Sequence, residues 1–237
     1  MKKIFLPLIV ALAALTSCNN CLEGVGDSVE ENRILADFDE LVLDCSADVI
    51  IRQNLISEKN RVNVIAQENL MPMIKTNVKG GSLIIDIEGC VTATAKLEIE
   101  VFTNGLSRIT ADGSGDVSTK NALKGESLTI SSDGSGDMEI KFRGEEMEVS
   151  SDGSGDLRLS GEAEDLSIDT DGSGDVDAFE FNANDVEVTA DGSGNVNITA
   201  KKSLEVTLSG SGNVSYKGNP QEIQQSNHGS GNIKNVD

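Results

Sequence analysis

The sequence predicts an all-β protein, a single-stranded parallel β-helix (β-solenoid) whose coils contain about nineteen residues each. The tripeptide Gly-Ser-Gly recurs seven times, at successive spacings of 21, 19, 19, 20, 18 and 19 residues. Only 3% of the residues are aromatic and Trp is absent. Such a chain cannot fill a wide globular core, whereas a narrow solenoid core lined by Val, Ile and Leu suits it. The glycines of the seven copies are Gly113 and Gly115, Gly134 and Gly136, Gly153 and Gly155, Gly172 and Gly174, Gly192 and Gly194, Gly210 and Gly212, and Gly229 and Gly231.

Strand-like alternation precedes each copy. Residues 204–208, for example, read Leu-Glu-Val-Thr-Leu, so that apolar and polar side chains point to opposite faces. An apolar residue also follows each copy, four positions past its first glycine. Each coil therefore contains two short strands and two turns, and it has too few apolar side chains to bury its own inner face. Stacking of successive coils would create the continuous core.

The glycines are predicted to form the corners of the coils. Glycine permits positive φ, and it also allows two backbones to approach where a side chain would block the neighbouring coil. Both properties are candidate reasons for the repeat.

Residues 36–108 depart from the repeat. Residues 41–51 are typical of one coil with a degenerate corner, and the alternating runs at 83–87 and 97–101 indicate hairpins and irregular coils. Because a solenoid needs its first coil covered, this region is expected to act partly as a cap. The expected division is a signal segment 1–17, a polar tether 18–35 and one solenoid domain 36–237, with regular coils from 109 onward.

The N-terminus has the features of a lipoprotein signal peptide. Lys2 and Lys3 precede an apolar run, too short to span a bilayer, that ends at Leu-Thr-Ser before Cys18. This order resembles the lipobox of bacterial lipoproteins, in which the cysteine is diacylated, and two acyl chains would anchor the chain to a membrane. The alternative is ordinary cleavage that leaves Cys18 free. We expect an exported outer-membrane lipoprotein, facing either the cell surface or the periplasm.

The mature chain is strongly acidic. Without residues 1–17 it contains 17 basic and 40 acidic residues, a net charge of −23. Nucleic acids and anionic headgroups are therefore poor partners, and cations or basic proteins are better ones.

Three further cysteines follow Cys18. In an exported protein, a disulfide between Cys45 and Cys90 is allowed, and two buried free thiols are the alternative. Cys21 lies too close to the predicted anchor to be expected to stabilise the fold.

Several motifs resemble those of the bacterial head-GIN domain family, whose members are described as auto-transporter adhesins. They are the leading Phe38-x-x-Leu41-x-Leu43 strand, the Gly-Ser-Gly ladder and the closing segment 209–220. The resemblance covers roughly residues 36–237. It implies a right-handed single-chain β-helix in the cell envelope, and it is specific for fold rather than for activity.

Aspartates flank the glycines in most copies. Stacked coils would place equivalent carboxylates about 4.8 Å apart, where they repel one another by roughly 1 kcal/mol in water. Either they act as solvated turn formers or calcium ions lie between them. Later copies have Asn195, Asn213 and Asn232 after the glycines, which favours the structural role. The candidate metal ligands are Asp112, Asp116, Asp133, Asp137, Asp152, Asp156, Asp171, Asp175 and Asp191.

The sequence does not favour an enzyme. The single histidine, His228, occupies a corner position without an identifiable catalytic partner, and Arg108, Arg143 and Arg158 are not placed in one groove by their spacing. We expect no catalytic residues and no cofactor. The predicted function is a non-enzymatic envelope lipoprotein, an adhesin or surface scaffold for an unknown protein or glycan. The alternatives are a calcium-binding structural module and, less favoured, a β-helix enzyme that acts on polysaccharides.

The C-terminal coil ends only two residues after Asn235, so no separate cap follows it. We expect either charged strands that protect the edge, Lys234 among them, or end-to-end dimers.

Overall fold

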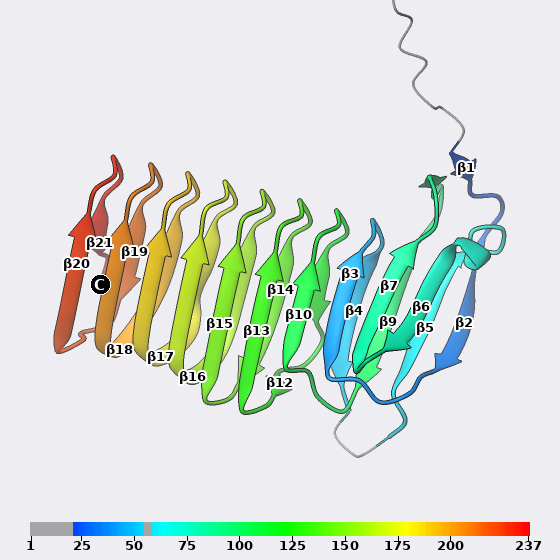
Figure 1. Cartoon of the computed structure of the whole chain (residues 1–237), viewed down its shortest axis with the longest axis horizontal. Helices are drawn as coiled ribbons and strands as arrows, with labels where there is room; N and C mark the ends of the chain where they lie inside the picture. The colour runs from blue at the N-terminus through cyan, green and yellow to red at the C-terminus, as the bar shows by residue number, and fades with distance from the viewer. Residues whose placement is uncertain (1–20, 55–57) are drawn as a thin grey trace, which may run out of the picture.

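The computed structural model describes residues 21–54 and 58–237, and it is an elongated stack of β-coils (Figure 1). Nineteen strands belong to one continuous hydrogen-bonded sheet that winds along the stack. The described residues contain a single 3-10 turn, η1 (Met71–Met73), and no helix able to span a membrane. The predicted β-solenoid is confirmed.

The Gly-Ser-Gly half of the chain forms regular parallel coils. Along one face Val117 pairs with Met138, and the pairing continues through Leu157, Val176, Val196 and Val214 to Ile233. The sequence repeat and the coil are thus the same unit. The strands of this half are β10 (Arg108–Ala111), β11 (Val117–Thr119), β12 (Leu123–Lys124), β13 (Ser127–Ser132), β14 (Met138–Arg143), β15 (Glu146–Ser151), β16 (Leu157–Thr170), β17 (Val176–Ala190), β18 (Val196–Leu208), β19 (Val214–Lys217), β20 (Glu222–Asn227) and β21 (Ile233–Asn235).

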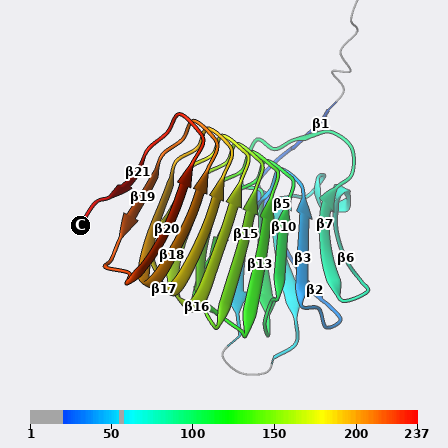
Figure 2. The same ribbon diagram turned by 60° about the vertical axis from the view of Figure 1, so that its left-hand side comes forward.

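Figure 2 shows the stack of coils from a second direction. A narrow apolar core runs through it. Each coil contributes a few alternating residues, such as Leu166 and Ile168 from one strand, and all are almost completely buried. The neighbouring coils complete the surroundings of each side chain, because no coil has enough apolar residues to shield itself.

The corner glycines are required for close stacking and not for positive φ. A Cβ atom on Gly134 would collide with the carbonyl oxygen of Gly113 in the preceding coil, and the same collision recurs at every later copy. None of these corner glycines has positive φ in the structure. Of the two reasons proposed from the sequence, only the close approach of the backbones applies.

The chain does not build its first coils in sequence order. Strands β3 (Glu40–Asp44) and β4 (Asp48–Gln53) form the coil below β10 and β11, which follow about 68 residues later. The next coil toward the N-terminal end contains β7 (Ser82–Ile87) and β9 (Glu98–Thr103), which pair in parallel with β3 and β4. The irregular coils expected over 36–108 therefore include an insertion that doubles back under the first coil.

The first coil has no glycines at its corner, and the path of the chain beneath it explains why. Cys45 and Ala47 occupy the positions below Gly113 and Gly115. In the coil beneath them the chain leaves the stack after β7 and forms β8 (Val91–Thr92), which pairs with β1 (Leu22–Glu23). Since no corner backbone lies directly under Cys45 and Ala47, a Cβ atom is accommodated there.

Antiparallel strands cover the N-terminal end. Strand β5 (Arg61–Gln67) pairs with β9 and with β2 (Ser28–Ile34), while β6 (Ile74–Lys79) pairs with β7. The expectation of a polar tether over residues 18–35 is wrong for residues 28–34, which form β2. Most side chains of this strand are exposed and polar, so the sequence shows no buried face, and its backbone bonds to β5 hold it in place. The predicted signal segment 1–17 and Cys18 lie outside the described residues.

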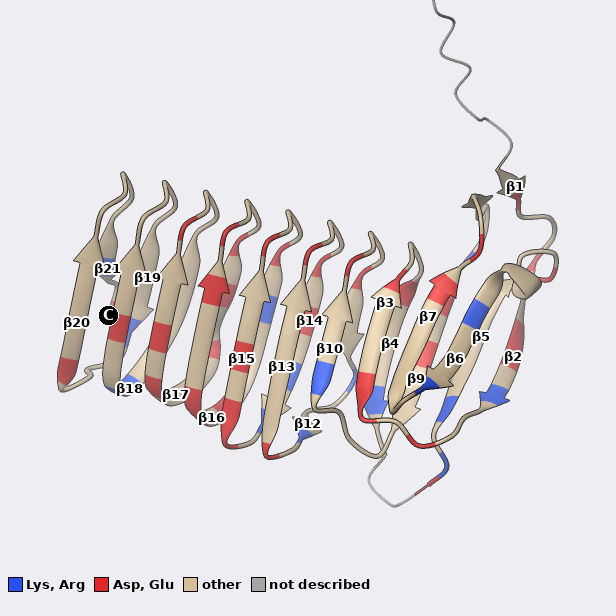
Figure 3. Ribbon diagram, viewed as in Figure 1, with Lys and Arg blue, Asp and Glu red and all other residues tan. Residues whose placement is uncertain are grey.

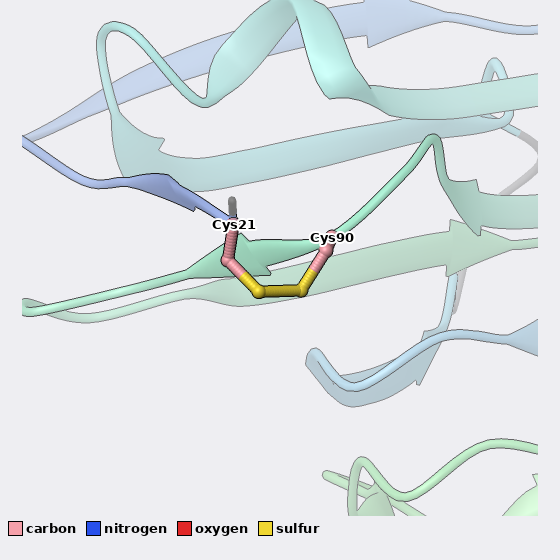
Figure 4. The surroundings of a disulfide bond; sticks show 2 residues. All are labelled: Cys21 and Cys90. Atoms are coloured by element: carbon pink, nitrogen blue, oxygen red, sulfur yellow. A yellow bond between two sulfur atoms is a disulfide. The ribbon is translucent and has the colours of Figure 1, made fainter. Parts of the chain in front are cut away.

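The disulfide joins Cys21 to Cys90 (Figure 4), so the candidate pair of Cys45 and Cys90 is wrong. Cys45 is a buried free thiol, and burial raises its pKa. The β1–β8 pairing brings Cys21 beside Cys90 outside the stack, whereas Cys45 is buried at a corner of the first coil. Nothing in the local sequence around Cys21 indicates this long-range pairing.

The last coil ends the stack with polar residues at core positions. Gln225 and Asn227 of β20 pair with the buried Val206 and Leu208 of the preceding coil. The Asn227 amide also donates to the carbonyl of Gly231 and accepts from the N–H of Gly229. Both side chains are exposed, whereas the equivalent residues of the preceding coil are buried.

Candidate functional surfaces

A ladder of acidic and amide side chains connects the coils just after the Gly-Ser-Gly corners. The backbone N–H of Asp156 donates to Oδ1 of Asp137 at 2.9 Å, and that of Asp175 donates to Oδ1 of Asp156 at the same distance. The series begins at Asp48, which accepts from the N–H of Asp116. One carboxylate oxygen of each residue thus bonds to the coil above, which offsets part of the repulsion between neighbours.

Asparagine continues this ladder with the same geometry. The N–H and side-chain amide of Asn195 both donate to Oδ1 of Asp175, and Asn213 bonds to Asn195 in the same manner. The ladder ends where Asn232 donates to Asn213. Since amide and carboxylate oxygens perform the same task, these positions act as coil-to-coil connectors.

The aspartates before the glycines behave differently. Asp112, Asp133, Asp152, Asp171 and Asp191 are exposed at the outer corner. Desolvation and the nearby charges of Asp133 and Asp44 raise the pKa of Asp112. On the adjacent strand, desolvation and the charges of Asp152, Asp191 and Asp171 likewise raise the pKa of Asp169. The corner is therefore a region of accumulated negative charge.

The candidate calcium ligands do not converge. Among the described residues, no three or more Asp, Glu, His or Cys side chains are grouped so that they could hold a metal ion. The aspartates form two rows of single residues, one per coil, and the row after the glycines already bonds to backbone N–H groups.

The ladder borders an acidic groove of about 480 Å³ on the face formed by β4, β11, β14, β16 and β17. One basic residue, Arg158, lies among its charged side chains. Carboxylates from several coils thus share one hollow, which favours cationic partners. The acidic residues that line it are Asp48, Glu98, Asp116, Asp137, Glu139, Asp156, Asp175 and Asp177.

The charge changes along the stack, as Figure 3 shows by the loss of red from the corners toward the C-terminal end. Residues 109–191 contain 22 acidic and 5 basic residues, whereas residues 192–237 contain 3 acidic and 4 basic ones. The strongly negative surface therefore belongs to the middle coils, and the last coils are nearly neutral.

The residues weighed for catalysis are dispersed. Arg158 lies in the acidic groove, Arg143 lies 3.8 Å from Glu162, and Arg108 lies 3.9 Å from Glu40 on another strand. His228 lies at the last corner, with its Nδ1 3.3 Å from the hydroxyl of Ser226. Arg143 and Arg108 thus lie near carboxylates of other strands, while Arg158 and His228 border different hollows.

A basic and aromatic pocket of about 500 Å³ lies on the N-terminal coils. Arg52, Arg61, Phe102 and Lys120 line it, and none of them was singled out from the sequence. They come from four separate segments, so only the pairing of the strands brings them together.

The fold and the ladder define an acidic parallel β-solenoid whose coils are connected by Asp and Asn side chains. The family model described as "Putative auto-transporter adhesin, head GIN domain" matches residues 37–220. The chain belongs to this family, as its motifs indicated.

Solved structures share the whole fold. A crystal structure described as a putative adhesin from Bacteroides fragilis has 25% identity and a TM-score of 0.86, covering 91% of this chain and 100% of the other. One described as a putative lipid binding protein from Parabacteroides distasonis has 25% identity and a TM-score of 0.76, covering 92% and 100%. A putative adhesin from Parabacteroides merdae has 22% identity and a TM-score of 0.71, covering 91% and 99%, and it shows the fold alone. Among curated proteins, none matches the chain significantly.

Proposed function

We propose that this chain is a non-enzymatic lipoprotein of the cell envelope that acts as an adhesin or surface scaffold. The observation that carries the proposal is the extended stack, whose outer faces present rows of charged and polar side chains while its interior is filled by apolar ones. Membership of an adhesin family and the likeness to a structure described as a putative adhesin support it.

The anchor is the first part of this proposal to test. Lipidation at Cys18 would attach the chain to the outer membrane and leave the solenoid to project from it. Metabolic labelling with a palmitate analogue should label the wild type and not the Cys18→Ser variant. A variant that remains labelled and membrane-bound would refute lipidation at this residue.

Protease treatment of intact cells tests which side of the membrane the protein faces. A surface adhesin should be degraded from outside, whereas a periplasm-facing scaffold should persist until the outer membrane is opened. Comparing the adherence of cells with and without the gene then tests adhesion itself. Unchanged adherence by cells that display the protein would contradict the adhesin role.

The acidic groove supports a second candidate, a calcium-binding structural module, because carboxylates from several coils line one hollow. Against it, each ladder carboxylate already bonds to a backbone N–H. Calorimetric titration separates the two proposals. The structural role of the ladder predicts no binding heat at millimolar calcium and an unchanged melting temperature in chelator, while saturable heat would favour the calcium module.

A further inference from the structure

The basic and aromatic pocket is built as one row across four adjacent strands. Phe102 of β9 pairs with Arg52 of β4 on one side and with Arg61 of β5 on the other. Thr119 of β11 pairs with Ile51, and the next residue, Lys120, donates its N–H to the carbonyl of Ile51. The row Lys120, Arg52, Phe102, Arg61 spans three strand spacings, about 14 Å.

The two arginines are held against the phenyl ring. The guanidinium carbon of Arg61 lies 3.8 Å from the centre of the Phe102 ring, and that of Arg52 lies 5.5 Å from it. Stacking of this kind limits the number of side-chain conformations and keeps the N–H groups oriented. The pocket therefore has preorganised donors.

The donors of this row are incompletely paired. Arg52 Nη2 lies 3.4 Å from Glu100, while its Nε is buried without a hydrogen-bond partner. Arg61 Nη1 lies 3.3 Å from Glu58, whose side chain is 57% exposed. Lys120 is exposed, and none of the ion pairs within the described part of the chain includes it. The buried Nε is out of a ligand's reach, but the side chains of Arg52 and Arg61 are 40% and 29% exposed. An incoming acceptor group would therefore bond to their remaining guanidinium N–H groups and to Lys120.

The surroundings restrict what can enter. Among the described residues that line the pocket, Arg52, Arg61 and Lys120 are basic and Glu58 is acidic, so this lining has a positive balance on a chain with a net charge of −21. The acidic groove starts on the same strand, β4, and would repel a long polyanion that extended across the face. A short anionic ligand fits these limits, whereas nucleic acid and an anionic membrane do not.

We propose that this pocket binds a saccharide that carries a carboxylate or sulfate group. The anionic group bonds to the guanidinium groups of Arg52 and Arg61 and to the ammonium of Lys120. The sugar ring lies in the remaining volume beside Phe102 and Asn54, within the size range of small-molecule sites. This proposal rests on the proposed surface role and names the ligand class for it.

Calorimetry on the purified protein tests the proposal without reference to cells. The probes are a uronic-acid disaccharide, a sulfated disaccharide, their neutral counterpart and inorganic sulfate. At least one acidic disaccharide should bind at least tenfold more tightly than the neutral one and than sulfate alone, and more weakly at high salt. Which of the two binds more tightly identifies the anionic group.

Variants assign the binding to the row. Arg52→Gln and Lys120→Gln should each weaken binding at least fivefold, with the melting temperature measured on the same samples to confirm folding. Arg158→Gln removes a positive charge from the acidic groove on the same face and should leave binding unchanged.

The proposal is overturned if the neutral disaccharide or sulfate alone binds as tightly as the acidic disaccharides, or if no probe binds. It is also overturned if Arg158→Gln weakens binding as much as Arg52→Gln and Lys120→Gln do. A domain that binds the acidic sugar in solution while cells that display it adhere no better than cells without it would refute the adhesin role and leave the pocket assignment intact.

Discussion

Replacing one corner glycine by alanine should destabilise the whole stack, and Gly155→Ala is the most direct case. The added Cβ would collide with the carbonyl oxygen of Gly136, which belongs to the backbone of the preceding coil. Neither backbone can move freely, because the N–H of Ser154 bonds to the carbonyl of Gly134 at 3.0 Å and that of Asp156 bonds to Asp137 at 2.9 Å.

The magnitude follows from these contacts. Overpacking a well-filled site costs typically about 1–3 kcal/mol. Separating the coils enough to accept the methyl group also weakens two hydrogen bonds, each contributing about 1 kcal/mol. We expect a loss of about 3–4 kcal/mol in the free energy of unfolding and a fall in the melting temperature on the order of 10 °C.

Thermal and urea denaturation followed by circular dichroism measure this loss. Gly125→Ala is the matched control, since a Cβ there meets its nearest atoms at 3.5 Å and the glycine does not have positive φ. The control should change stability by less than about 0.5 kcal/mol. If the two variants lose the same amount, or if Gly155→Ala costs less than about 1 kcal/mol, close stacking is not the reason for the repeat.

Four further predictions concern the ladder, the charges and the two ends of the stack. Asp156→Asn should preserve stability, because its amide oxygen still accepts from the N–H of Asp175. Asp156→Ala should lower the free energy of unfolding by about 1 kcal/mol. Equal urea midpoints for the two variants would contradict the connector role. The pKa of Asp169 is raised in the folded state, so the ionised carboxylate destabilises the fold. This destabilisation is present above the folded pKa and is relieved as pH falls. Asp169→Asn should therefore raise the melting temperature at pH 7, with an advantage that shrinks toward acidic pH, and a constant difference at all pH values would exclude this cause. Cys21→Ser should change the global stability by less than about 1 kcal/mol, because β2 remains paired with β5. Hydrogen exchange should accelerate in residues 22–27. A large fall in melting temperature would show instead that the disulfide stabilises the stack itself. Light scattering should find a monomer for the wild type. Gln225→Val should associate, because it places an apolar side chain at the exposed position that pairs with Val206. A wild-type dimer would instead favour end-to-end pairing.

The repeat allowed much of the fold to be predicted, since its period is the length of one coil. The alternation before each copy identified buried positions such as Leu166 and Ile168, and the drift from Asp to Asn already favoured a structural ladder. These features are local and recur in every coil, so each copy reinforces the same prediction. The N-terminal strand β2 escaped prediction because its exposed side chains follow no buried pattern.

The sequence by itself determined the β-solenoid, its coil length and the family, because stacking repeats the same local constraints in every copy. Only the tertiary structure decided which coil comes first, that Cys21 pairs with Cys90, and that Arg52, Phe102, Arg61 and Lys120 lie in one row. These features depend on contacts between segments up to 69 residues apart, where the chain leaves its repeat and doubles back. The tertiary structure also identified the physical role of the glycines, because the collision that excludes a side chain exists only when two coils lie against each other.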